Sequence, residues 1–165
     1  MRRQSQASYA AAIRQLATAL QSRDAGLIIF GPLPFFPNRP VLATPLSLCQ
    51  PEWYRPAQNL PAGCRPSLSS RDGLIDYLQS LNALLSSLEN ELPNLRVFRP
   101  FSAICPPDQS QCSTFRGDRM LFTDTNHLSR EGVRLLEDPF LRFLHQQGLN
   151  LLKQRSVPSQ GRGRL

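Results

Sequence analysis

The sequence is poor in several features that would indicate particular functions. It has two His, one Trp and a single Lys (Lys153), and it contains no long uninterrupted apolar run. A membrane-spanning helix needs about 20 consecutive apolar residues. The basic start Met1-Arg2-Arg3 is not followed by one, because Arg14 and Gln15 interrupt the only candidate. We therefore expect neither a signal peptide nor a transmembrane segment in this chain.

The net charge of +7 comes almost entirely from Arg. A net positive charge of this size is found in proteins that bind nucleic acid, in proteins attracted to an anionic envelope or polysaccharide, and in soluble proteins with neither role. The Arg residues are scattered, and no nucleic-acid-binding motif contains them. The sequence therefore does not predict a nucleic-acid partner.

The four Cys can pair in three ways. Sequence-local pairing predicts the disulfides Cys49–Cys64 and Cys105–Cys112, because each pair brackets a Pro-rich loop. Metal binding is the alternative, but the spacings do not match a zinc ribbon and no His lies near. We therefore predict no metal and no cofactor. Disulfides imply an oxidising compartment.

Apolar periodicity predicts three helices. The first runs from about Gln4 to Ser22, with Tyr9, Ile13, Leu16 and Leu20 at helical spacing and Ala10 and Ala17 beside them. The second follows Ser69-Ser70-Arg71-Asp72, which is typical of a capping box, and its Leu stripe runs from Leu74 to Leu88. The third follows the N-cap Ser129, and we expect Pro139 to restart or kink it.

Two short apolar segments, Leu27–Phe30 and Leu95–Phe98, predict buried strands of parallel type. The order of elements predicts an α/β three-layer α/β/α sandwich with a parallel sheet. We expect one domain over residues 4–148 and a disordered basic tail over residues 149–165. In such sheets, reactive groups collect beyond the carboxyl ends of the strands.

The segment Leu121–Gly132 contains the pair that can carry chemistry. Asp124 precedes His127 by three residues, so a tight loop can place a carboxylate against an imidazole. That arrangement fixes the imidazole tautomer and leaves the other ring nitrogen free to deprotonate a hydroxyl nucleophile. The alternatives are a turn or cap role for Asp124 and an ordinary surface or core role for His127.

The extended pattern F-x-D-x-x-H-L-S-x-x-G resembles the last conserved block of the SGNH (GDSL-like) esterases and acyltransferases. It is most similar to the SGNH domains fused to membrane acyltransferases that O-acylate bacterial surface polysaccharides. The segments Gly26–Pro34 and Cys105–Cys112 fit the same branch, and the resemblance covers roughly Tyr9 to Leu144.

The resemblance implies a Ser-His-Asp mechanism in which His127 is the base and Asp124 orients it. It further implies a carbohydrate or acyl-ester substrate, a membrane acyltransferase domain in cis or trans, and a periplasmic or cell-envelope location. The sequence departs from the family in having no Gly-Asp-Ser and no Gly-x-Asn-Asp, since Gly117-Asp118 is followed by Arg119. We therefore expect the C-terminal part of such a domain, without its nucleophile and inactive in isolation. The alternative is a non-catalytic α/β remnant or partner-binding fragment.

Five other residues give weaker indications, and four of them allow two interpretations. His145 suits the C-terminal end of a helix, where the helix dipole favours it. Trp53 and Tyr54 can pack under their loop or stack on a sugar ring. Pro32 and Pro34 can shape the loop after the first strand or contact substrate.

Overall fold

The computed structural model describes residues 2–37, 64 and 66–148. The longer helices are α1 (Arg2–Gln21), α2 (Arg71–Glu91) and α4 (Arg130–Gln146), and α3 (Phe101–Ile104) is a single turn. The strands are β1 (Leu27–Phe30), β2 (Leu68–Ser70), β3 (Leu95–Phe98), β4 (Gln111–Ser113), β5 (Phe115–Arg116) and β6 (Arg119–Met120). The predicted tail at 149–165 lies outside the described residues.

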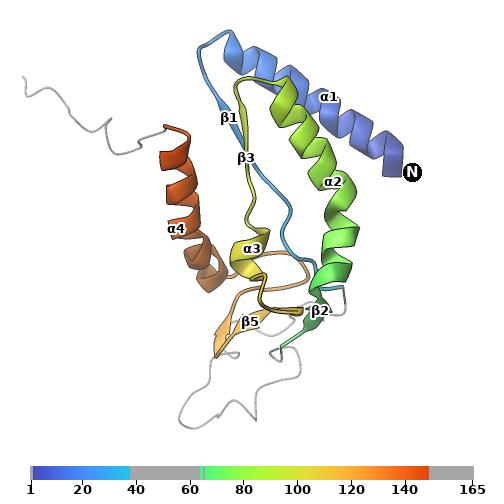
Figure 1. The fold of residues 1–165 in the computed structure, drawn as a ribbon, viewed down its shortest axis with the longest axis vertical. Helices are drawn as coiled ribbons and strands as arrows, with labels where there is room; N and C mark the ends of the chain where they lie inside the picture. The colour runs from blue at the N-terminus through green and yellow to red at the C-terminus, as the bar shows by residue number, and fades with distance from the viewer. Residues whose placement is uncertain (1, 38–63, 65, 149–165) are drawn as a thin grey trace, which may run out of the picture.

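The centre of the fold is the parallel pair of β1 and β3, which have the bounds predicted from the sequence. Their register runs from Leu27 opposite Leu95 to Phe30 opposite Phe98. Helices α1 and α2 lie on one side of this pair and α4 lies on the other (Figure 1). The predicted α/β class is therefore confirmed, with a sheet of only two strands in the described part of the chain.

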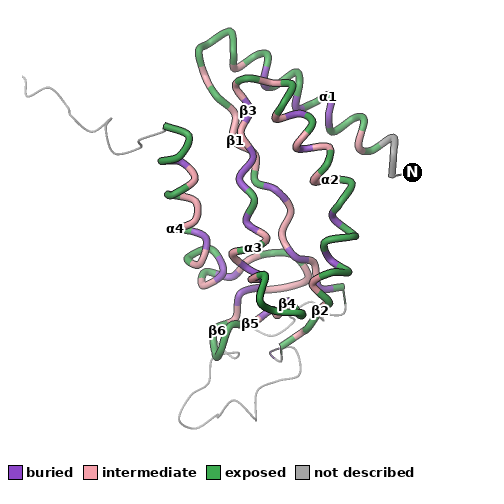
Figure 2. The backbone as a smooth tube through the Cα atoms, viewed as in Figure 1, coloured by how far each residue is buried: buried purple, intermediate pink, exposed green. Residues whose placement is uncertain are grey.

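The side of the pair that faces α1 and α2 is a compact apolar core. It contains Ala10 and Ile13 of α1, Leu85 and Leu88 of α2, and Leu95 and Val97 of β3. Figure 2 shows the buried residues concentrated along β3 and on the inward turns of the helices. On the opposite side, aromatic rings connect the strands to α4, since Phe98 lies 5.1 Å from Phe140 between ring centroids.

The buried stripe of α1 differs from the one the sequence predicted. Ala10, Ile13 and Ala17 are buried, whereas Tyr9 and Leu16 are 42% and 50% exposed. Helix α1 contacts both α2 and β1. Small Ala side chains let helix axes approach closely, and the larger apolar residues are then displaced towards solvent.

The start of α2 also corrects the prediction in detail. Ser70 is the N-cap, and its hydroxyl accepts a hydrogen bond from the Gly73 N–H at 3.3 Å. The third helical residue is therefore Gly73 and not an acid, so the reciprocal half of a capping box is missing. The predicted Leu stripe is present, with Leu74, Leu78, Leu85 and Leu88 buried.

Helix α4 runs without a break through Pro139, so it does not restart there. The kink, which was the other expectation, stays a prediction. Its N-cap is Ser129, as predicted, and the side chain accepts from the Gly132 N–H. Leu136 and Leu144 are buried on its inner face. One lost backbone hydrogen bond at Pro139 is evidently offset by this packing.

Short elements that the sequence did not predict lie before α2 and between β3 and α4. Strands β2 and β4 pair antiparallel, as do β5 and β6. The predicted disulfide Cys105–Cys112 is present and joins the end of α3 to β4. Both Cys lie in a second apolar cluster with Phe36, Leu121, Phe122 and Leu136.

Candidate functional site

Asp124 and His127 lie on a tight loop between two paired residues. Phe122 and Leu128 form an isolated antiparallel bridge. Inside this bridge, the backbone N–H of Thr123 donates to the carbonyl oxygen of His127 at 2.8 Å. The chain therefore reverses within a few residues, which brings the side chains at 124 and 127 to the same side.

The two oxygens of the Asp124 carboxylate have different partners. Oδ1 accepts hydrogen bonds from the backbone N–H groups of Asn126 at 3.0 Å and of His127 at 2.8 Å. Oδ2 lies 2.6 Å from Nδ1 of the His127 ring. Asp124 thus acts both as a turn residue and as the partner of the imidazole.

These contacts lower the pKa of Asp124 from 3.8 to about 2. The largest cause is the hydrogen bond from the Asn126 N–H, and the backbone and side chain of His127 act in the same direction against partial burial. The carboxylate is consequently ionised at neutral pH and can only accept hydrogen bonds. The proton between the two side chains therefore belongs to Nδ1 of His127.

The imidazole of His127 projects into solvent. Its side chain is 73% exposed, whereas that of Asp124 is 27% exposed. Within the described part of the chain, Nε2 of His127 has no hydrogen-bond partner. Nε2 is therefore a free basic nitrogen. The Asp124 carboxylate fixes the tautomer of the ring by accepting the hydrogen bond of Nδ1–H.

The loop is fastened to the segment that follows β1. The backbone N–H of Phe36 donates to the carbonyl oxygen of Thr125 at 2.8 Å. The ring of Phe36 packs on that of Phe122 with 5.0 Å between centroids, and both rings are fully buried. Because Phe36 follows the carboxyl end of β1, the Asp124–His127 loop lies where parallel sheets place their reactive groups.

The motif residues that follow His127, namely Ser129 and Gly132, hold the start of α4 in place. The Ser129 hydroxyl donates to the carbonyl oxygen of Met120 and accepts from the N–H of Gly132 at 3.1 Å. The Ser129 N–H donates to the carbonyl oxygen of Leu121 at 2.8 Å. Gly132 packs directly on that same carbonyl, where a Cβ atom would overlap it. The start of α4 is thus held tightly against the strand-like segment that precedes Asp124.

An apolar cavity of about 350 Å³ lies next to the loop. Leu128, the neighbour of His127, lines it together with Leu33, Phe30, Val133 and Phe140. Phe30 is 54% exposed and Val133 is 58% exposed, so the cavity opens to solvent. His127 does not line it, and the expectation that Nε2 faces a cleft remains a prediction.

The other predicted residues lie apart from this loop. Cys64 is buried and disulfide-bonded, but its predicted partner Cys49 is outside the described residues, as are Trp53 and Tyr54. His145 is in the last turn of α4, as predicted. Pro34 is buried and Pro32 half-buried, which suits loop shaping.

One position that supports the loop was missed by sequence reasoning, and a second was part of the motif but had no role assigned to it. Phe36 gave no signal, because an aromatic residue after a strand has no fixed role. Gly132 gave a weak signal, because a Gly in the first turn of a helix is unfavourable and implies a close approach.

Within the described ranges, no helix is long and apolar enough to cross a membrane. The same residues contain no group of three or more His, Cys, Asp or Glu that could hold a metal ion.

A comparison with protein families places the chain. A family model described as the SGNH domain (fused to AT3 domains) matches residues 1–142. The chain belongs to this SGNH family. Neither curated proteins nor solved structures gave a significant match. The family agrees with the resemblance carried by the Asp124–His127 block, and it associates this chain with acyltransferase domains.

Proposed function

We propose that Asp124 and His127 are the orienting acid and the general base of an SGNH-type O-acyltransferase or esterase that acts on acyl esters of cell-surface polysaccharide. The observation that carries the proposal is the 2.6 Å contact between Asp124 Oδ2 and His127 Nδ1, with Nε2 left free. A buried or turned-away His127 would not have been compatible with this role.

In the proposed reaction, Nε2 of His127 takes the proton of a Ser hydroxyl as its oxygen attacks the ester carbonyl. Collapse of the tetrahedral intermediate expels the alcohol, which receives that proton from the imidazolium, and leaves an acyl-serine. A saccharide hydroxyl then attacks the acyl-serine in transfer, or water does so in hydrolysis. Asp124 remains ionised throughout and stabilises the imidazolium.

The nucleophile in this proposal is not in a Gly-Asp-Ser motif of the sequence, because no such motif is present. Another segment or polypeptide has to present the Ser to Nε2, together with most of the oxyanion hole. The family name supports a membrane acyltransferase domain as the partner, and we place the reaction in the cell envelope.

The tautomer of His127 can be tested without any activity. In ¹⁵N NMR at neutral pH, we expect His127 to carry its proton on Nδ1, while the exposed His145 serves as an internal reference. Asp124→Asn should remove this preference. An unchanged tautomer in that variant would contradict the orienting role of Asp124.

Catalysis is tested by adding back a nucleophile. The purified chain should not hydrolyse p-nitrophenyl acetate alone, but should do so with an SGNH segment that carries Gly-Asp-Ser. Activity should disappear in His127→Ala, fall by about 10³–10⁴-fold in Asp124→Asn, and persist in His145→Ala. Equal activity of His127→Ala and wild type would overturn the proposal, and no activity with the added segment would favour a non-catalytic, partner-binding protein.

A further inference from the structure

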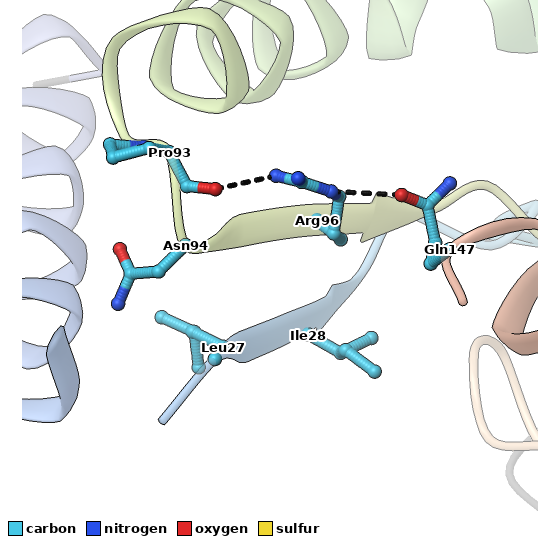
Figure 3. A pocket seen from close by; sticks show the side chains of 7 residues that line it. Leu27, Ile28, Pro93, Asn94, Arg96 and Gln147 are labelled. Carbon is cyan, nitrogen blue, oxygen red and sulfur yellow. Dashed lines mark hydrogen bonds between the residues drawn. The ribbon is translucent and has the colours of Figure 1, made fainter. Parts of the chain in front are cut away.

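A second cavity, of about 250 Å³, lies at the opposite end of the parallel strand pair from Asp124 and His127 (Figure 3). It is lined by the first residues of β1 (Leu27 and Ile28), by Asn94 and Arg96 around the start of β3, and by Gln147 after α4. Reactive groups of a parallel sheet lie beyond its carboxyl ends. This cavity at the amino ends is therefore separate from the site described above.

The guanidinium of Arg96 is held in place by three hydrogen bonds. Nε donates to Oε1 of Gln147 at 2.8 Å, and Nη1 donates to the carbonyl oxygens of Pro93 at 2.9 Å and Leu95 at 2.7 Å. Figure 3 shows the bonds to Pro93 and Gln147 on either side of the guanidinium. Arg has five N–H donors, and the two on Nη2 have no partner among the described residues.

The charge of Arg96 is not balanced by a carboxylate within the described residues. Three other Arg residues form ion pairs, namely Arg14 with Glu91, Arg99 with Glu89 and Arg134 with Glu131. All three printed partners of Arg96 are neutral. The sequence over residues 149–165, which follows Gln147 closely, contains four basic and no acidic side chains. The cavity thus holds a fixed positive charge.

The rest of the lining restricts the ligand. Ile28, which lies opposite Arg96 in the strand register and therefore on the same face of the sheet, supplies aliphatic surface beside the guanidinium. A phosphate carries about two negative charges and three strong acceptor oxygens, which one cation with two free donors does not satisfy. A carboxylate carries one charge and can accept a charge-assisted hydrogen bond from one of these N–H groups. The cavity volume of about 250 Å³ lies below the range of about 300–1,000 Å³ that is usual for drug-sized ligands, so the cavity suits a small ligand.

From these observations we infer that the cavity binds a short aliphatic carboxylate. The carboxylate accepts a hydrogen bond from Nη2 of Arg96, and the alkyl chain lies against Ile28. Gln147 is a positioning residue, because it holds Nε of Arg96 and leaves Nη2 directed to the ligand.

The probe for a test is sodium butyrate at constant ionic strength, followed by amide shifts in ¹H–¹⁵N spectra of the whole chain. We expect saturable shifts at Leu27, Ile28 and Arg96. Butan-1-ol and butylammonium should not reproduce them, because neither offers an anionic acceptor.

Four variants decide the assignment. Arg96→Met should weaken butyrate binding by at least about tenfold, and Arg119→Met, which loses the same charge from exposed strand β6, should not. Gln147 is exposed, so Gln147→Ala should leave the fold intact. It should weaken butyrate binding less than Arg96→Met does, because it removes only the group that positions Arg96. Asp124→Asn should have no effect, which separates this inference from the proposed ester chemistry. Equal shifts with chloride, or unchanged butyrate binding in Arg96→Met, would overturn the inference.

Discussion

Gly132 lies in direct contact with the carbonyl group of Leu121, so that the first turn of α4 rests on the segment that leads into Asp124. The contact is possible only because residue 132 has no side chain. The same carbonyl oxygen accepts the N–H of Ser129. One peptide group thereby fixes both the start of the helix and the end of the loop that carries His127.

This contact predicts that Gly132→Ala destabilises the fold by about 1–3 kcal/mol, the usual cost of an overpacked site. The methyl group would overlap the Leu121 carbonyl and come within 2.9 Å of Cδ2 of Leu128. Urea unfolding of the purified chain, followed by circular dichroism, measures the change.

Gly73 provides a matched control for this substitution. It occupies the same position in α2, and its N–H also donates to the hydroxyl of an N-cap Ser. A Cβ there would lie 3.6 Å from Ser70, an ordinary contact. Gly73→Ala should therefore be neutral or stabilise the fold by up to about 1 kcal/mol. Equal stability of the two variants would contradict the packing argument.

The sequence predicted the parts of this fold that depend on local patterns. The strands Leu27–Phe30 and Leu95–Phe98, the N-cap Ser129 of α4 and the Asp124–His127 pairing each follow from residues close together in the chain. The buried stripe of α1 was not predictable, because the choice of Ala10 and Ala17 over Tyr9 and Leu16 depends on the approach of α2. The contact between Phe36 and Phe122 joins residues 86 positions apart in sequence, and no local signal specifies it.

A pH-dependent contribution to stability follows from the lowered pKa of Asp124, which falls from 3.8 to about 2 on folding. A carboxylate whose pKa is depressed in the folded state stabilises the fold fully above its unfolded pKa. That contribution is lost as the pH falls through the window from 3.8 to about 2. We expect Asp124→Asn to lower the melting temperature at pH 6, and the difference from wild type to shrink steadily below pH 4.

Asn suits this test because its side-chain oxygen can still accept from the N–H groups of Asn126 and His127. The substitution thus removes the charge and preserves the turn. Asp118→Asn is the control, since Asp118 is exposed in the turn between β5 and β6. A melting-temperature difference for Asp124→Asn that stays constant from pH 7 to pH 2 would rule out this titration.

The disulfide Cys105–Cys112 is expected to stabilise the region beneath the loop. Both residues are fully buried in the cluster that contains Leu121 and Phe122. Replacing both Cys by Ala should cost about 2–4 kcal/mol, the typical contribution of a native disulfide. Peptide mapping under non-reducing conditions should recover Cys105–Cys112 and, as the sequence predicts, Cys49–Cys64. A double variant with wild-type stability would show that the cluster alone holds this region.

The contact of Phe36 with the loop predicts that substitutions at Phe36 and at its neighbour Phe35 have different effects on the NMR signals of His127. Phe36 is 1% exposed and packs on Phe122, one residue before Thr123. Phe36→Ala should cost about 3–5 kcal/mol, as is usual for deleting a buried ring. It should also change the NMR signals of His127, because the loop would lose the ring beneath it.

Phe35 allows the two effects to be separated. It is half-buried, and its ring stacks on Tyr77 of α2 with 6.3 Å between ring centroids, whereas the ring of Phe36 packs on Phe122. Phe35→Ala should therefore cost less stability and leave the His127 signals in place. If both variants shift His127 equally, the loop responds to general loosening of the segment after β1. If only Phe36→Ala shifts the His127 signals, the buried contact between Phe36 and Phe122 is what fixes the position of His127, the proposed base, relative to β1.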